Sequence, residues 1–174
     1  MSTPWTDTDR ETTLKAIGFA NRKIVTAWTE REPEREIPWT PLEKPLSEAR
    51  VALVSTAALA VHGDEPFDQE GERQNPWWGD PSYRVLPGTT RTGDASSYHM
   101  HINTSVADRD LDSVMPLARL AELESQGFVG SSAPSHYSFM GYILKPAELL
   151  ERSAPAMIRQ MKTEEVDVAL LVPV

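Results

Sequence analysis

Apolar residues follow two spacings along the chain, one typical of amphipathic helices and one typical of buried strands. Residues 8–31 carry apolar side chains at helical spacing, and Pro33 ends this predicted helix. Residues 32–47 hold four prolines among charged residues, which predicts an extended connector. Residues 1–47 are therefore predicted to form an N-terminal helix and a proline-rich connector. This arm is expected to pack on the main body or on a partner chain.

The remaining residues, 48–174, show the pattern of an α/β domain. Strands are predicted at 50–57, 83–86, 98–103 and 167–174, and helices at 116–126 and 146–162. The first strand is apolar on both faces, which suits the centre of a parallel sheet. Pro155 should bend the second helix. A helix followed by a buried strand is the second half of a βαβ unit. The predicted fold is an open, mostly parallel sheet with flanking helices, of the Rossmann or flavodoxin type.

The last predicted strand ends the sequence with no loop or helix after it. In open α/β sheets the functional loops follow the carboxyl ends of the strands. The domain is therefore expected to be incomplete at its C-terminus, as part of a longer protein or of a gene read to an internal stop. The alternative interpretation is an edge strand that closes a complete fold.

Composition narrows the classes of function. The net charge of −9, with no basic cluster, argues against nucleic-acid binding. The start of the chain has no signal peptide, and the longest apolar runs reach about eight residues, short of the ~20 that a membrane helix needs. We therefore expect a cytoplasmic protein. The 174 residues contain no cysteine, which excludes disulfides, thiolate metal sites and a thiol nucleophile within them.

Two histidines are the first candidates for chemistry. His99 and His101 lie two positions apart, so on the predicted strand they face the same side. They suit acid–base catalysis or the positioning of a substrate carboxylate. With Asp108 or Asp110 they would form a metal site, although a structural role for the pair is equally open.

Hydroxyl groups near other predicted strand ends give a second set of candidates. His136 stands among Tyr137 and Ser138, but no Gly-x-Ser-x-Gly elbow supports a serine hydrolase. Ser55 and Thr56 lie at the tip of the first predicted strand, where hydroxyl and backbone N–H groups can bind a carboxylate. Asp64 is a candidate in an acidic loop that also suits a solvated surface.

Several segments in series resemble one family. They are residues 51–59, 62–68, 79–84, 99–101 with 108–111, 115–120, 133–142 and 166–174. Over about residues 45–174 the chain resembles the selenoprotein B family of glycine, sarcosine, betaine and D-proline reductases, known from bacterial amino-acid metabolism. The resemblance implies reductive cleavage of a C–N bond in a small amino-acid or betaine-like substrate.

The resemblance also implies what surrounds this chain. In the family a selenocysteine or cysteine attacks the substrate directly beyond the last strand, so we expect that residue just beyond Val174 and no other cofactor or metal within the chain. Other reductase subunits and a homo- or hetero-oligomer are expected. His99, His101 and His136 become the catalytic candidates. Tyr137 and Ser138 would line the substrate pocket.

Two further functions remain open at this point. The first is a non-catalytic α/β subunit or small-molecule binding module. The second is a metal-dependent hydrolase built on the His-x-His pair. Whether the chain is itself an enzyme stays open, because it lacks the redox nucleophile, and we expect no reductase activity from these 174 residues alone.

Overall fold

A computed structural model describes residues 22–23, 26–27, 30, 40–75 and 78–174. The predicted helix over 8–31 and most of the connector lie outside these residues. The four described residues 22, 23, 26 and 27 are helical. The residues from Leu42 to Val174 form a unit of their own, with the sheet and the helices described below. The predicted domain boundary at residue 47 stays a prediction.

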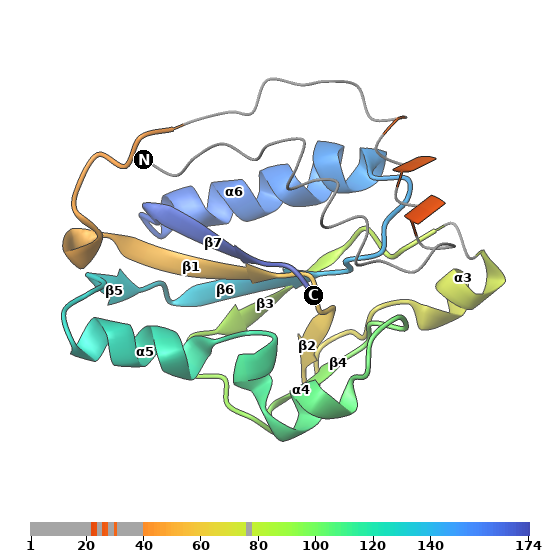
Figure 1. Cartoon of the computed structure of the whole chain (residues 1–174), viewed down its shortest axis with the longest axis horizontal. Coiled ribbons are helices and arrows are strands. Elements are labelled where there is room, and N and C mark those ends of the chain that lie inside the picture. The colour runs from red at the N-terminus through yellow and green to blue at the C-terminus, as the bar shows by residue number, and fades with distance from the viewer. Residues whose placement is uncertain (1–21, 24–25, 28–29, 31–39, 76–77) are drawn as a thin grey trace. The chain divides into compact units, whose positions relative to one another are not determined.

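Figure 1 shows how helices and strands alternate in this unit. The strands are β1 (Arg50–Ser55), β2 (Leu59–Val61), β3 (Tyr83–Pro87), β4 (Ala95–Ser97), β5 (Ser131–Ser132), β6 (Ser135–Phe139) and β7 (Val168–Val172). The α-helices are α3 (Gln69–Gln74), α4 (Ser105–Arg109), α5 (Leu117–Ser125) and α6 (Ala154–Thr163). Two 3₁₀ turns, η1 (Leu46–Glu48) and η2 (Leu111–Ser113), and a π-helical turn, η3 (Leu149–Ser153), complete the set.

The main sheet is built around β1. The strands β5, β6 and β7 all pair with β1 in parallel, and β3 pairs with β6 in antiparallel orientation. The strands β2 and β4 form a separate antiparallel pair. The predicted α/β class with a mostly parallel sheet is confirmed, and β3 is the antiparallel exception in the main sheet.

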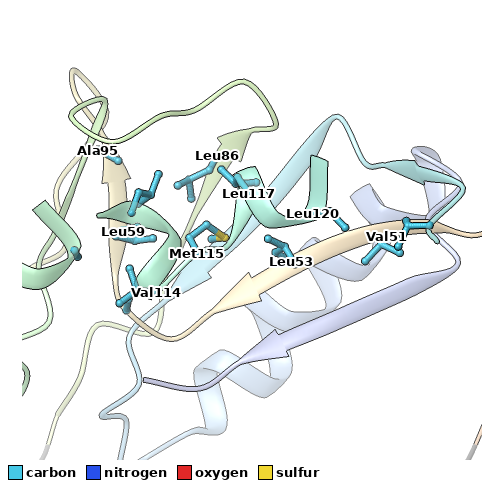
Figure 2. Packing of buried hydrophobic residues seen from close by; sticks show 13 residues of the cluster. Val51, Leu53, Leu59, Leu86, Ala95, Val114, Met115, Leu117 and Leu120 are labelled. Carbon is cyan, nitrogen blue, oxygen red and sulfur yellow. The ribbon is translucent and has the colours of Figure 1, made fainter. Parts of the chain in front are cut away.

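Both faces of β1 are buried, as its apolar run predicts. Val51 and Leu53 point to a cluster that includes Met115, Leu117 and Leu120, at and just before α5 (Figure 2). The alternate residues Ala52 and Val54 belong to a second cluster on the other face, with Met157 of α6. Figure 1 shows α5 and α6 on opposite faces of the sheet. Because successive side chains of a strand point to opposite faces, β1 contributes residues to both hydrophobic clusters.

The first predicted helix ends where the sequence indicates, and the second contains a π-helical turn just before its proline. Helix α5 closes with Gly127 at φ +74°, and the N–H groups of Gly127 and Phe128 donate to Glu124 and Leu123 in a Schellman motif. Before Pro155, the Ala154 N–H reaches back five residues to the Leu149 carbonyl. This π-helical turn accommodates the proline, which has no N–H to continue the α-helical ladder.

Two strand predictions are wrong in part. Residues 98–103 form a turn rather than a strand: the pairing with the β1–β2 segment ends at the Tyr98 N–H, which donates to Ala58, and within the turn the His101 N–H donates to the His99 side chain. The strand β7 forms as predicted but is not buried. Its described partner is β1 on one side, and Leu170 and Leu171 are 50% and 69% exposed. The segment between β2 and β3, where no helix was predicted, contains the short helix α3.

Candidate functional site

The carboxyl ends of β1 and β7 meet at Thr56. The Thr56 N–H donates to the Val172 carbonyl at 3.2 Å, and Thr56 Oγ1 accepts from the Val174 N–H at 2.8 Å. The same hydroxyl lies 3.4 Å from the Val174 carbonyl, to which it donates. One side chain therefore fixes both backbone groups of Val174. This is the end of a parallel sheet at which α/β proteins place their functional groups.

His99 is buried next to this strand end. Its Nδ1 accepts from the His101 N–H at 3.1 Å, so the proton of the neutral ring lies on Nε2. Among the described residues, no hydrogen bond is formed by Nε2. A Cβ at Gly141 would lie 3.0 Å from His99 Nε2 and also 3.0 Å from both Thr56 Oγ1 and Thr56 O. Burial, and secondarily His101, lower the pKa of His99, which favours the neutral ring.

The His101 ring pairs with a buried carboxylate, that of Glu72. Its Nε2 lies 2.7 Å from Glu72 Oε1, and the ring centroid is 4.2 Å from that of Tyr142. The Glu72 side chain is 2% exposed, whereas that of His101 is 46% exposed. The other oxygen, Glu72 Oε2, is buried with no hydrogen-bond partner. A carboxylate in this position orients the imidazole, which is itself partly exposed.

The two histidines therefore lie together, but not as predicted. Because residues 98–103 form a turn, the rings of His99 and His101 stand at 90° to each other with centroids 5.9 Å apart. Glu72 was missed by the sequence reasoning. It lies in an acidic stretch with no distinguishing pattern, and only the fold of α3 against the turn brings it to His101.

His136 lies between β1 and β6 rather than with the other two histidines. Its Nδ1 accepts from the Leu53 N–H at 2.9 Å, and its Nε2 lies 3.2 Å from Ser132 Oγ. The side chain is fully buried, and burial lowers its pKa to about 4. The ring fills a gap in the ladder between the short pairings of β1 with β5 and with β6. These contacts give His136 a structural role, and its catalytic role stays a prediction.

The two predicted serines support the turn after β1. Ser55 Oγ accepts from the Ala57 N–H at 3.1 Å. Ser138 Oγ accepts from the Leu59 N–H at 2.8 Å and donates to the Ser55 carbonyl at 3.2 Å. Both side chains are fully buried. Asp64 lies in an exposed turn after β2, where its N–H donates to Val61. Of the predicted substrate-binding residues, the structure brings Thr56 to His99.

Comparison with known proteins adds the next observation. The chain is similar to the gamma subunit of a D-proline reductase. That protein, from Acetoanaerobium sticklandii, is 31% identical to the chain over 133 residues, which are 76% of this chain and 52% of the relative. The chain thus spans about half the length of this relative. No family model matches the chain, and no solved structure matches it.

The similarity to a D-proline reductase subunit supports the predicted relation to this class of reductases. The metal-dependent hydrolase alternative would need a group of metal ligands. Among residues 40–75 and 78–174 and the few described before them, no three histidine, cysteine, aspartate or glutamate side chains are grouped to hold a metal ion. Asp110 instead caps η2, where its Oδ1 accepts from the Asp112 N–H at 3.1 Å.

None of the described helices is long and apolar enough to cross a membrane.

Tyr137, predicted to line a substrate pocket, lies in the core. Its side chain is fully buried, and its hydroxyl has no hydrogen-bond partner. Burial, with Glu164 and Tyr83 nearby, raises the pKa of this phenol.

We expect Tyr137→Phe to stabilise the chain by about 1 kcal/mol, because it removes a buried polar group that is left unsatisfied. Chemical denaturation measures the change, with Tyr98→Phe as a control. A destabilised Tyr137→Phe variant would show that the hydroxyl is satisfied in solution.

Proposed function

We propose that the chain is a component of a reductase of the glycine, sarcosine, betaine and D-proline class, which cleaves a C–N bond reductively. The similarity to a D-proline reductase subunit is the observation that carries this proposal. The arrangement of His99, His101 and Thr56 at the ends of β1 and β7 supports it. A small amino-acid or betaine-like molecule is the proposed substrate, and the cytoplasm is the proposed location.

The redox residue of this reductase is proposed to follow Val174. Reductive cleavage needs a soft anionic nucleophile that can later be released through a mixed dichalcogenide. The chain has no cysteine, and the relative is about twice as long as the matched region. A selenocysteine or cysteine after Val174 would stand at the strand end that Thr56 fixes. Within this proposal the 174 residues provide the scaffold and the polar groups around the redox residue.

Other subunits are part of the proposal. An apolar groove of about 280 Å³ runs between α6 and β7. Phe139, Met157 and Leu171 are among its lining residues, and every lining residue is apolar. An exposed edge strand beside an apolar groove is a surface that proteins usually cover. A partner subunit of the reductase is the proposed cover.

The decisive experiment reads the gene beyond the Val174 codon and then assays two chains. We expect a triplet ordinarily read as stop, followed by a continuing frame that matches the rest of the relative. The chain extended through that frame, with cysteine at the redox position, should reduce D-proline, sarcosine, glycine or betaine when the partner subunits and a dithiol are supplied. The 174-residue chain should not, under the same conditions.

Two results would contradict the proposal. One is an ordinary stop with no matching frame downstream. The other is turnover by the 174-residue chain alone. An extended chain that binds one of the four compounds without turning it over would instead favour the alternative of a non-catalytic binding module.

A further inference from the structure

Glu72 carries a buried carboxylate that the fold leaves only half satisfied. Its Oε1 lies 2.7 Å from His101 Nε2, and its side chain is 2% exposed. Its other oxygen, Oε2, is buried and has no hydrogen-bond partner in the part of the chain that the structure describes. A buried polar atom without a partner lowers stability, so its presence needs an explanation other than the stability of the fold. The neighbouring glutamate of α3, Glu70, is exposed and pairs with Arg73 and Gln74.

The His101 ring is fixed by its neighbours and is still partly exposed. Glu72 lies at Nε2, the Tyr142 ring packs with its centroid 4.2 Å away, and the side chain is 46% exposed. Among the described residues, Nδ1 of this ring has no hydrogen-bond partner. His99 and His136 differ, since they are 4% and 0% exposed and burial lowers the pKa of both. Of the three predicted catalytic histidines, His101 is therefore the one suited to exchange protons with its surroundings.

We propose that Glu72 is a positioning residue that keeps the proton of the neutral His101 ring on Nε2, so that Nδ1 is the nitrogen that accepts a further proton. An ionised carboxylate accepts hydrogen bonds and donates none, so the 2.7 Å contact requires an N–H at Nε2. A carboxylate in this position also stabilises the imidazolium that forms when the other nitrogen takes up a proton. This role explains why a half-satisfied carboxylate is kept in a buried position.

The use of this pair in catalysis rests on the proposed function. In the proposed reaction the C–N bond breaks, a dithiol is oxidised to a disulfide, and the two protons that the thiols release end on carbon and on nitrogen. The carbon that loses its nitrogen therefore needs a proton in each of the four proposed substrates. His101 carries this proton, because Nδ1 takes it up from a thiol and gives it to the carbon.

The first test measures the reactivity of the four histidines of the chain. Diethyl pyrocarbonate transfers an ethoxycarbonyl group to an unprotonated imidazole nitrogen, and peptide mass spectrometry reports each histidine separately. The reaction is run at pH 8, where an ordinary histidine is neutral. We expect Glu72→Gln and Glu72→Met to lower the rate constant of His101 by about threefold or more, because Nδ1 is a weaker nucleophile without an anion at Nε2. His62, which is also partly exposed, is the internal reference.

Matched variants separate the charge of Glu72 from the fold. Glu70→Gln removes a carboxylate from the same helix and should leave the rate constant of His101 unchanged. Glu72→Met should melt at or above the temperature of the parent, because it removes a half-satisfied buried carboxylate and leaves His101 partly exposed to water. Glu72→Gln keeps the shape of the side chain and decides the test if Glu72→Met does not fold. Long-range ¹H–¹⁵N spectra of histidine-labelled chain report which ring nitrogen of His101 carries the proton.

The outcomes are distinct. An unchanged or raised rate constant of His101 in the folded Glu72 variants overturns the inference, because Glu72 would then only support or shield the ring. A neutral His101 ring with its proton on Nδ1 overturns it as well. In the reductase assay, His101→Gln should lower kcat about 100-fold with KM little changed, and an unchanged kcat overturns the catalytic role. Failure of the proposed function is seen separately, as no turnover by the parent, because the reactivity measurement needs no substrate or partner subunit.

Discussion

Acidification from pH 6.5 to pH 4 is expected to remove about 3 kcal/mol from the free energy of unfolding of the chain through His136 alone. In the fold this ring must stay neutral, because Nδ1 accepts from the Leu53 N–H in a fully buried site. Burial lowers its pKa from the ordinary 6.5 to about 4. At about 1.4 kcal/mol per pKa unit, this difference gives the expected loss.

The sign follows from proton uptake. Between pH 6.5 and about pH 4 the unfolded chain binds a proton at His136 that the folded chain does not. The free energy of unfolding therefore rises with pH across this window. The contribution of His136 is fully present above the window and is constant below it. His99, whose pKa burial also lowers, adds a contribution of the same sign.

Urea denaturation at half-unit steps between pH 7.5 and pH 4 measures this effect. His136→Asn is the matched control, since an asparagine Oδ1 can accept from the Leu53 N–H in place of Nδ1 but does not titrate. The parent should lose about 3 kcal/mol more than this variant over the window. If the parent and His136→Asn lose the same free energy of unfolding between pH 7.5 and pH 4, His136 becomes protonated in the fold as readily as in the unfolded chain. The subtraction removes the carboxylates, which are common to both proteins.

Gly79→Ala is expected to destabilise the unit by about 3 kcal/mol or more, enough to prevent folding at 37 °C in a marginally stable domain. A Cβ at this position would overlap the Tyr142 carbonyl and meet Ile143 Cγ1 at 3.1 Å. A carbonyl of the backbone cannot turn aside as the end of a flexible side chain can. Tyr142 would have to move, and with it the ring that packs on His101 at 4.2 Å.

The control for this prediction is Gly127→Ala. Gly127 has φ +74°, but nothing lies within 4 Å of the position of its Cβ. The substitution should cost about 1 kcal/mol through backbone strain alone. Thermal and urea unfolding of both variants give the comparison. Equal losses in the two variants would mean that the segment at Gly79 yields without cost and that the close approach to Tyr142 is unimportant.

The elements that local pattern determines could be predicted from the sequence. The run from Val51 to Val54 is apolar at every position, and that pattern has one common explanation, a strand covered on both faces. Helix α5 carries its own stop signal at Gly127. The exposure of β7 could not be predicted in the same way. The apolar sequence of Leu170 and Leu171 indicates a strand that needs covering, but not whether the described residues cover it.

Most members of the site could be predicted, but not Glu72 and not the geometry. The spacing of His99 and His101 marks them as a pair, yet the alternation of residues 98–103 is that of a strand, and contacts with the β1–β2 turn override it. The Tyr98 N–H donates to the carbonyl of Ala58, which is 40 positions away in sequence. The residues next to Tyr98 in the sequence do not indicate this contact. The pairing of Glu72 with His101 has the same origin. Histidine is a residue type that often serves in catalysis, but at His136 the hydrogen bond from the Leu53 N–H to Nδ1 gives the side chain a structural role.

The parallel pairing of β1 with β7 has a consequence for how the protein is made. The contact between Thr56 and Val174 spans 118 positions, so β1 leaves the ribosome long before the strand that pairs with it. At a translation rate of about 5–20 residues per second, the β1 edge waits on the order of ten seconds for β7. During that interval an apolar strand with free N–H and C=O groups is open to other nascent chains. We therefore expect the cellular yield to depend on how well this edge of β1 is shielded during synthesis, as well as on the stability of the finished fold.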